Sequence, residues 1–180
     1  MKLISVLLSC ALCVQSVAVM AQTDRVLRDK EINESALIEA LNPEPVMGQT
    51  RSIRVMPAGE AAPAPKRPQA SMLITFETNS AELTPKAKDM LDVLGRALQS
   101  DKLAQFKFAI EGHADPRSGA DFNLQLSQTR ATTVVRYLAE HQHISKSRLT
   151  AIGKGQSELL NTHDPVAPEN RRVTVKTLME

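Results

Sequence analysis

The pattern of apolar and polar positions changes period several times after residue 70. Residues 72–76 (MLITF) are almost all apolar, which is typical of a buried strand. Residues 105–112 and 173–178 alternate, so every second side chain would face the core. Residues 149–152 form a short apolar run that two nearby glycines would end, Gly153 and Gly155. These four segments are predicted to be strands.

Two longer segments have helical spacing. Thr84 offers a hydroxyl cap and Pro85 occupies the first helical position, which together favour a helix start. The apolar positions that follow at this spacing are Ala87, Met90, Leu91, Leu94, Ala97 and Leu98. A second helix is predicted from Asp121 to His141. The side chains that it is expected to bury are Leu124, Ala131, Val134, Val135 and Leu138.

This order of elements, βαβαββ, predicts an α+β fold. Both helical segments are long enough to serve as crossovers between parallel strands, and the last strand follows a short loop. We therefore expect a small mixed sheet with two main helices packed on one face.

The first 21 residues have the pattern of a secretory signal peptide. Lys2 precedes an apolar run from Leu3 to Val19, and small or apolar residues lead up to Ala21, where cleavage is expected. The alternative is a retained membrane anchor, but the run is slightly short for a span and no basic cluster follows it. After cleavage we expect no membrane span. Both cysteines lie within this segment, so the rest of the chain has no disulfide framework.

Two further segments precede the predicted domain, which covers residues 71–180. Residues 22–56 form a polar arm with one short helix expected from Asn33 to Leu41 and an edge strand within residues 49–56. This arm is interpreted either as a docking segment for another envelope protein or as a disordered spacer. Residues 57–70 form an Ala/Pro-rich linker that is too poor in large apolar groups to build a core.

Composition excludes two classes of ligand. The formal net charge is +2, which is too balanced for a nucleic-acid partner held through its phosphates. The chain has four Phe, one Tyr and no Trp, so few rings are available to stack on bases or, by the same logic, on sugars. Charge and hydrogen bonds must therefore carry the recognition.

An acidic and a basic side chain are predicted to meet at one edge of the sheet. Asp115 follows the strand at residues 105–112, and a short loop returns the chain to a helix that carries Asn123 and Arg130. A carboxylate accepts from an ammonium group and a guanidinium grips a carboxylate, so the pair suits a zwitterion. The alternative is that Asp115 and Arg130 form a structural salt bridge with each other.

No catalytic residue, metal site or cofactor is predicted. His113 shares a strand face with Asp115, but no third ligand or nucleophile is spaced to join them. The other histidines lie in polar contexts without ligand spacing. The chain is therefore expected not to be an enzyme.

Four motifs resemble the signature of the OmpA-like, or OmpA C-terminal, domain family. They extend over nearly all of residues 72–178, in the family's order and spacing. The motifs are FETNSAEL from Phe76, GHAD from Gly112, LSQTRA from Leu126 and NRRV from Asn170.

The resemblance implies a binding site for the meso-diaminopimelate of a peptidoglycan stem peptide. In this family an aspartate and an arginine bind its ammonium and carboxylate, and these roles would fall on Asp115 and Arg130. The resemblance also assigns Asn123, Leu126, Ala114 and Asn79 to the site. Ala114 stands where the family usually has threonine, and Phe122 where it often has tyrosine, so each position lacks a hydroxyl.

The leading hypothesis is a non-catalytic peptidoglycan-binding protein of a Gram-negative periplasm, bound to the wall or associated with the outer membrane. The alternative is an adaptor between envelope proteins that uses residues 22–56, with wall binding secondary. A cell-wall hydrolase would need a catalytic constellation that the sequence does not provide.

Overall fold

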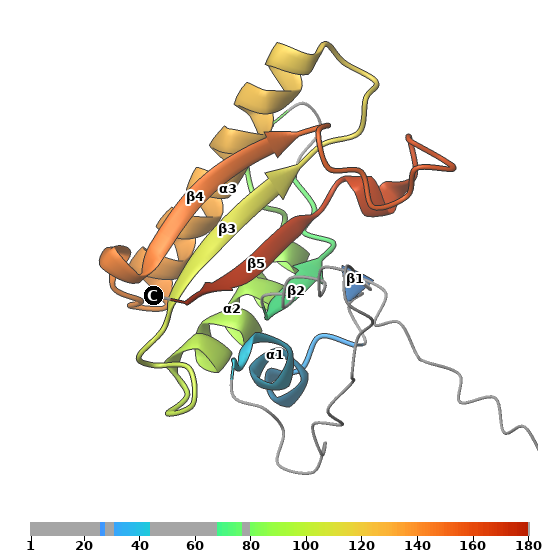
Figure 1. Ribbon diagram of the computed structural model, residues 1–180. Helices are drawn as coiled ribbons and strands as arrows, with labels where there is room; N and C mark the ends of the chain where they lie inside the picture. Colours follow the sequence, from blue (N-terminus) through green and yellow to red (C-terminus); the bar gives the residue numbers. More distant parts are fainter. Residues whose placement is uncertain (1–25, 28–30, 44–67, 77–79, 180) are drawn as a thin grey trace, which may run out of the picture.

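The computed structural model describes residues 26–27, 31–43, 68–76 and 80–179 (Figure 1). The predicted signal peptide, the possible strand within residues 49–56, most of the linker and Asn79 lie outside these ranges. The elements are β1 (Val26–Leu27), α1 (Glu34–Leu41), β2 (Gln69–Met72), α2 (Pro85–Gln99), β3 (Lys107–His113), α3 (Ala120–His141), β4 (Leu149–Gly155) and β5 (Val173–Leu178). Single 3-10 turns precede β4 and β5.

The strands form one mixed sheet in the order β1-β2-β5-β3-β4. β3 and β4 are parallel and joined by α3, whereas β5 lies between β2 and β3 and is antiparallel to both. The α+β class and the mixed sheet are therefore confirmed. Because β5 runs against β3, the residues that enter β5 lie beside the residues that leave β3.

One face of the sheet is covered by helices and the other is open (Figure 1). Phe108 and Ile110 of β3 are fully buried in a core shared with α2 and α3, as expected for two main helices on one face. The short helix α1 adds to this layer. Its Leu37 and Leu41 are fully buried in the same core, and the Thr177 hydroxyl of β5 donates to the Leu41 carbonyl.

The helix starts follow from local chemistry. The Thr84 hydroxyl accepts from the Ala87 N–H at 3.2 Å, with Pro85 in the first turn, as predicted. The Asn33 side chain caps α1 in the same way, at 2.8 Å from the Ala36 nitrogen. No helix within the described ranges combines the length and the apolar character that crossing a membrane requires.

Two strand predictions were wrong in their limits. The first strand occupies residues 69–72 rather than 72–76, and Phe76 makes only an isolated bridge to Leu83. β4 continues through Gly153 to Gly155 instead of ending before them. These strand positions are glycine because α3 passes too close for a side chain. A Cβ at Gly153 would lie 2.7 Å from the Gln128 backbone nitrogen.

Candidate functional site

The ends of three elements meet at one edge of the sheet. β3 ends at His113 and Asp115 lies just beyond it, while α3 begins after Gly119. Gly112 is paired with Val173, the first residue of β5, so Arg171 arrives next to Asp115 although 56 residues separate them in the chain. The antiparallel position of β5 thus brings a second arginine to this edge.

Asp115 is held by two arginines. Arg171 donates from Nη1 to Oδ2 at 2.7 Å, and the Arg117 guanidinium reaches the same oxygen from Nε at 3.1 Å and Nη2 at 3.0 Å. The Arg117 backbone N–H donates to Oδ1 at 3.3 Å. Burial alone would raise the pKa of Asp115, but the hydrogen bonds and charges of Arg171 and Arg117 outweigh it and lower the pKa below 3.8. The carboxylate is therefore ionised at neutral pH.

Arg130 takes a different set of contacts. Its Nε donates to the Ser80 carbonyl at 3.1 Å, and its guanidinium lies over the Phe76 ring at 4.8 Å from the centroid. Within the described residues it makes no ion pair with Asp115, so the expected alternative of a direct structural salt bridge is not seen. Burial and the charge of Arg171 lower the pKa of Arg130 while Asp115 raises it, and the group stays protonated.

A cavity of about 260 Å³ opens between these groups. We call it the arginine cavity. It is lined by Leu73, Ile74, Thr75, Phe76, Gly112, His113, Arg130, Pro168, Arg171, Arg172 and Val173. Its charged lining is entirely cationic, and Asp115, which is not part of the lining, pairs with Arg171 at 2.7 Å. The cavity is therefore suited to a small ligand that carries a carboxylate.

Two buried asparagines fix the loops around the cavity. The Asn123 side-chain nitrogen lies within hydrogen-bonding distance of the Asp115 and Ser118 carbonyls and the Gln156 side chain, at 2.8–3.0 Å. Asn170 is fully buried; its side-chain oxygen accepts from two backbone N–H groups, and its nitrogen lies 2.9–3.2 Å from three carbonyls within residues 161–165. Both asparagines hold backbone in place around the cavity.

The small residues of the LSQTRA segment seat α3 on the sheet. The Ser127 hydroxyl accepts from the Gly155 N–H and donates to the Leu124 carbonyl, each at 2.9 Å. Ser127 is 1% exposed and Ala131 is fully buried. Both partners of the Ser127 hydroxyl are backbone groups, so this hydroxyl has a structural role and is unsuited to nucleophilic attack.

Of the remaining expected site residues, Ala114 and Leu126 are not part of the cavity lining, and Asn79 lies outside the described residues. Ala114 is buried, with its N–H donating to the Gly155 carbonyl at 2.8 Å. Leu126 is half-buried on α3. Leu124 was expected to be buried and is not: its side chain is 49% exposed, because Asn123 and Ser127 are the residues that α3 turns toward the sheet at this level.

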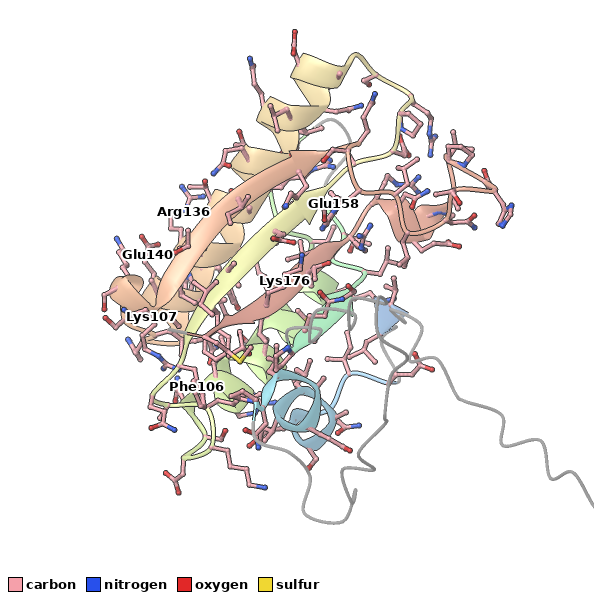
Figure 2. The ribbon with its side chains drawn as sticks, viewed as in Figure 1. Phe106, Lys107, Arg136, Glu140, Glu158 and Lys176 are labelled. Atoms are coloured by element: carbon pink, nitrogen blue, oxygen red, sulfur yellow. The ribbon has the colours of Figure 1, made fainter. Side chains whose placement is uncertain are left out.

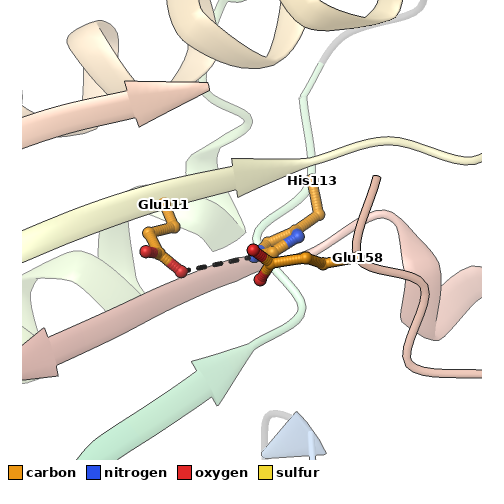
Figure 3. A group of neighbouring side chains, drawn as sticks. All are labelled: Glu111, His113 and Glu158. Atoms are coloured by element: carbon orange, nitrogen blue, oxygen red, sulfur yellow. Dashed lines mark ion pairs between the residues drawn. The ribbon is translucent and has the colours of Figure 1, made fainter. Parts of the chain in front are cut away.

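A second polar cluster lies on the open face of the sheet (Figure 3). Glu111, His113 and Glu158 bring potential ligand atoms within 4.8 Å of one another, although the sequence offered His113 no third partner. Lys176 pairs with Glu111 at 2.6 Å and Lys154 with Glu158 at 2.7 Å. These lysines already supply the positive charge that a metal ion would bring, so the cluster is better suited to an ion-pair network than to a metal.

The sequence predictions missed three contacts of the site. Arg171 was recognised in the NRRV motif, but its orientation was left open, and the structure turns it to Asp115. Phe76 supports Arg130 from the turn after β2, and Arg117 binds Asp115 from the following loop. The only available signal for Phe76 and Arg171 was their place in the motifs, and Arg117 lies in none of them, because the contacts depend on how the connecting segments and β5 are placed in space.

Comparison with known proteins agrees with this fold. The chain is 34% identical over 103 residues to the peptidoglycan-associated lipoprotein of Pseudomonas aeruginosa, covering 56% of this chain and 59% of that protein. It is 34% identical over 127 residues to outer membrane protein A of Yersinia pseudotuberculosis, covering 67% of this chain and 36% of that protein. The chain thus matches less than two thirds of the length of either relative.

A solved structure and a family model extend the comparison. The putative MotB-like protein from Desulfovibrio vulgaris superposes with a TM-score of 0.51 at 27% identity, covering 62% of this chain and 73% of that one. The model of the OmpA family matches residues 75–172, which include Asp115, Arg130 and Arg171. With more than half of its length matched, the chain belongs to the OmpA family.

Proposed function

We propose that the chain is a non-catalytic cell-envelope protein that binds peptidoglycan by holding the zwitterionic end of meso-diaminopimelate in the arginine cavity. The observation that carries the proposal is the pair of cationic groups, Arg130 and Arg171, that face this cavity next to the ionised Asp115. Membership in the OmpA family and the similarity to peptidoglycan-associated lipoproteins support the same ligand.

The carboxylate of the ligand would bind Arg130. The Nε of Arg130 is used by the Ser80 carbonyl, but its Nη groups donate to no other group in the described residues. Phe76 holds the guanidinium plane in position, which favours two parallel hydrogen bonds to a carboxylate. The side chain is thus pre-oriented, and little of its conformational freedom remains to be lost on binding.

The ammonium group of the ligand would bind Asp115. Asp115 is one anion among the three cations Arg117, Arg130 and Arg171, so the site itself has an excess of positive charge. An ionised carboxylate offers about four lone-pair positions, which allows an ammonium to bind while Arg171 stays in place. The arginines would attract a ligand that has only a carboxylate, but a zwitterion would pair both with the arginines and with Asp115.

The size of the cavity favours an amino-acid head over a sugar pair. A volume of about 260 Å³ lies just below the range of about 300–1,000 Å³ typical of drug-sized ligands. The described lining contains one phenyl ring, Phe76, and Arg130 already lies over it, 4.8 Å from its centroid. Recognition would therefore fall on the peptide stem and not on the glycan.

We place the protein in the periplasm of a Gram-negative bacterium, at the wall or the outer membrane. The expected signal peptide supports this location, as do the relatives, a peptidoglycan-associated lipoprotein and an outer membrane protein A. The adaptor alternative loses part of its motivation, since Leu37 and Leu41 of the expected short helix are fully buried against the domain itself.

Co-sedimentation with purified sacculi tests the proposal. Wild-type protein should pellet with sacculi that contain diaminopimelate and less well with walls that carry lysine, which lacks the distal carboxylate. Arg130→Ala, Arg171→Ala and Asp115→Asn should each remain largely in the supernatant. Two exposed positions away from the site give matched controls: Arg96→Ala, whose partner is Glu34 of α1, and Asp101→Asn. Equal pelleting of the site variants and wild type would refute the clamp.

A further inference from the structure

The carboxylate of Asp115 is fully used by arginine donors. Four nitrogens lie 2.7–3.3 Å from its oxygens, and three of them belong to Arg117: Nε, Nη2 and the backbone nitrogen. The fourth is Nη1 of Arg171, which lines the arginine cavity. A carboxylate offers about four lone-pair positions, so these donors use its full capacity. An ammonium group can therefore bind Asp115 only if one of the two guanidinium groups withdraws.

Arg117 is the arginine that can withdraw. Its side chain is 59% exposed, against 39% for Arg171. Within the described residues, the Arg117 guanidinium contacts no acceptor besides Asp115, whereas Arg171 also donates to the Val166 carbonyl at 3.3 Å. Rotation about its side-chain bonds would take the Arg117 guanidinium into water, while its backbone N–H stays on Oδ1.

The loop that carries Arg117 leaves room for this rotation. Residues 117–119 are exposed, and a Cβ at Gly119 would meet nothing within 4 Å. The Asn123 side-chain nitrogen lies 2.9 Å from the Asp115 carbonyl and 3.0 Å from the Ser118 carbonyl. The backbone on both sides of Arg117 is therefore held in place, and only its side chain needs to move.

The buried Glu111 is also held by two cations, but neither is comparably exposed. Lys176 lies 2.6 Å and Lys154 3.7 Å from its carboxylate, and their side chains are 25% and 26% exposed (Figure 2 labels Lys176 on β5). Both lysines also approach Glu158, at 4.0 Å and 2.7 Å. Neither lysine can leave Glu111 without weakening its pairing with a second carboxylate. Within the same part of the chain, Arg117 has no second carboxylate to lose.

We propose that Arg117 competes with the ammonium group of the ligand for Asp115, and that its guanidinium turns into solvent when that group binds. The inference rests on the proposed function, because it takes Asp115 as the acceptor of the ammonium. Arg171 remains on Asp115 and at the cavity, so Arg117 alone sets the cost of access to the carboxylate. This cost applies to every ligand that uses Asp115 and to none that carries only carboxylates.

Titration of the full chain with two small ligands tests the competition. One is free meso-diaminopimelate, and the other is pimelate, the same diacid without amino groups. Arg117→Ala should bind meso-diaminopimelate about 2- to 5-fold more tightly than wild type, the range expected for the loss of one exposed ion pair. It should gain no affinity for pimelate, which has no ammonium group to place on Asp115. Arg96→Ala, an exposed arginine paired with Glu34, should leave both affinities at the values of wild type.

The NMR signal of the Arg117 Nε–H gives a direct readout of the movement. In wild type, meso-diaminopimelate should shift this signal toward the position of a solvent-exposed arginine, and pimelate should not. Equal or weaker binding of meso-diaminopimelate by Arg117→Ala, or an unmoved Arg117 signal at saturation, would overturn the competition while leaving the clamp intact. If wild type did not bind meso-diaminopimelate, the proposed function would fail and the role of Arg117 with it.

Discussion

His113 is a buried imidazole whose two ring nitrogens have no hydrogen-bond partner among the described residues. Burial, followed by the positive charge of Arg172, lowers its pKa from 6.5 to about 3. Lys154 and Lys176 act in the same direction, and only Glu158 opposes them. The ring is therefore neutral in the folded protein at any pH at which the domain is expected to work.

This neutral ring predicts a loss of stability in mild acid. The unfolded chain takes up a proton at His113 near pH 6.5, whereas the folded chain resists it down to about pH 3. The contribution is therefore complete above pH 6.5 and lost as the pH falls toward 3. The carboxyl groups with lowered pKa, Asp115 and Glu158, lose their contributions only below their ordinary values of 3.8 and 4.5. A change in the free energy of unfolding between pH 6.5 and 4.5 should therefore reflect His113.

Chemical denaturation between pH 7.5 and 4.5 measures this effect. The free energy of unfolding of wild type should fall across the interval, and that of His113→Gln should fall distinctly less. His163→Gln removes an exposed histidine and serves as the control, with the slope of wild type. A His113→Gln slope equal to that of wild type would show that the buried ring does not cause the acid sensitivity.

At the scale of single residues, the sequence could identify Asp115 and Arg130 but not their partners. Motif and spacing bring both to one edge of the sheet. That Asp115 binds Arg171 instead of Arg130 depends on β5 lying antiparallel beside β3, a pairing between segments about 60 residues apart. Periodicity records which face a side chain occupies and contains no information on such pairings.

The contact between α3 and β4 explains why the end of β4 was predicted wrongly. Glycines after an apolar run ordinarily indicate the end of a strand, so Gly153 and Gly155 were expected to end β4. In the structure, Gly153 and Gly155 are instead the positions of β4 at which the backbone of α3 comes close. The Gln128 side chain binds both the Gly153 N–H, at 2.6 Å, and the Ala151 carbonyl, at 3.2 Å, and so covers the outer edge of β4. Arg130 lies two residues further along this same helix.

Gly153→Ala should therefore destabilise the domain. Its Cβ would lie 2.7 Å from the Gln128 nitrogen and 2.8 Å from the Leu124 carbonyl oxygen, both backbone atoms that move only with the helix. We expect a loss of about 1–3 kcal/mol in the free energy of unfolding, the usual cost of overpacking. Urea denaturation gives the value.

Gly119→Ala is the matched control for this substitution. Nothing lies within 4 Å of a Cβ at Gly119, which precedes α3 with a φ of −60°. Its loss should stay below about 1 kcal/mol, the scale of a helix-cap effect. If the two alanine variants were equally stable, close packing would not be the reason for glycine in β4.

On the scale of the whole molecule, the folded unit is larger than the segment that carries the motifs. The family match covers residues 75–172 and so leaves out β2, β5 and α1. β5 is the strand that joins β3 to β2, and α1 buries two leucines in the common core. A narrow apolar stripe in the sequence predicted the short helix α1. Such a stripe alone does not reveal whether the helix is buried by its own domain or by a partner.

Leu41→Ala tests whether α1 is a part of the domain. The Leu41 side chain is fully buried, and its carbonyl accepts a hydrogen bond from the Thr177 hydroxyl. Truncation to alanine should cost about 2–5 kcal/mol in the free energy of unfolding, because a cavity remains between α1, α2 and the sheet. Glu39→Ala changes an exposed residue of the same helix and should cost less than about 0.5 kcal/mol.

We expect a single unfolding transition that shifts in Leu41→Ala and not in Glu39→Ala. An unshifted transition would mean that α1 folds apart from the domain, and its leucines would then be available to a partner in the envelope.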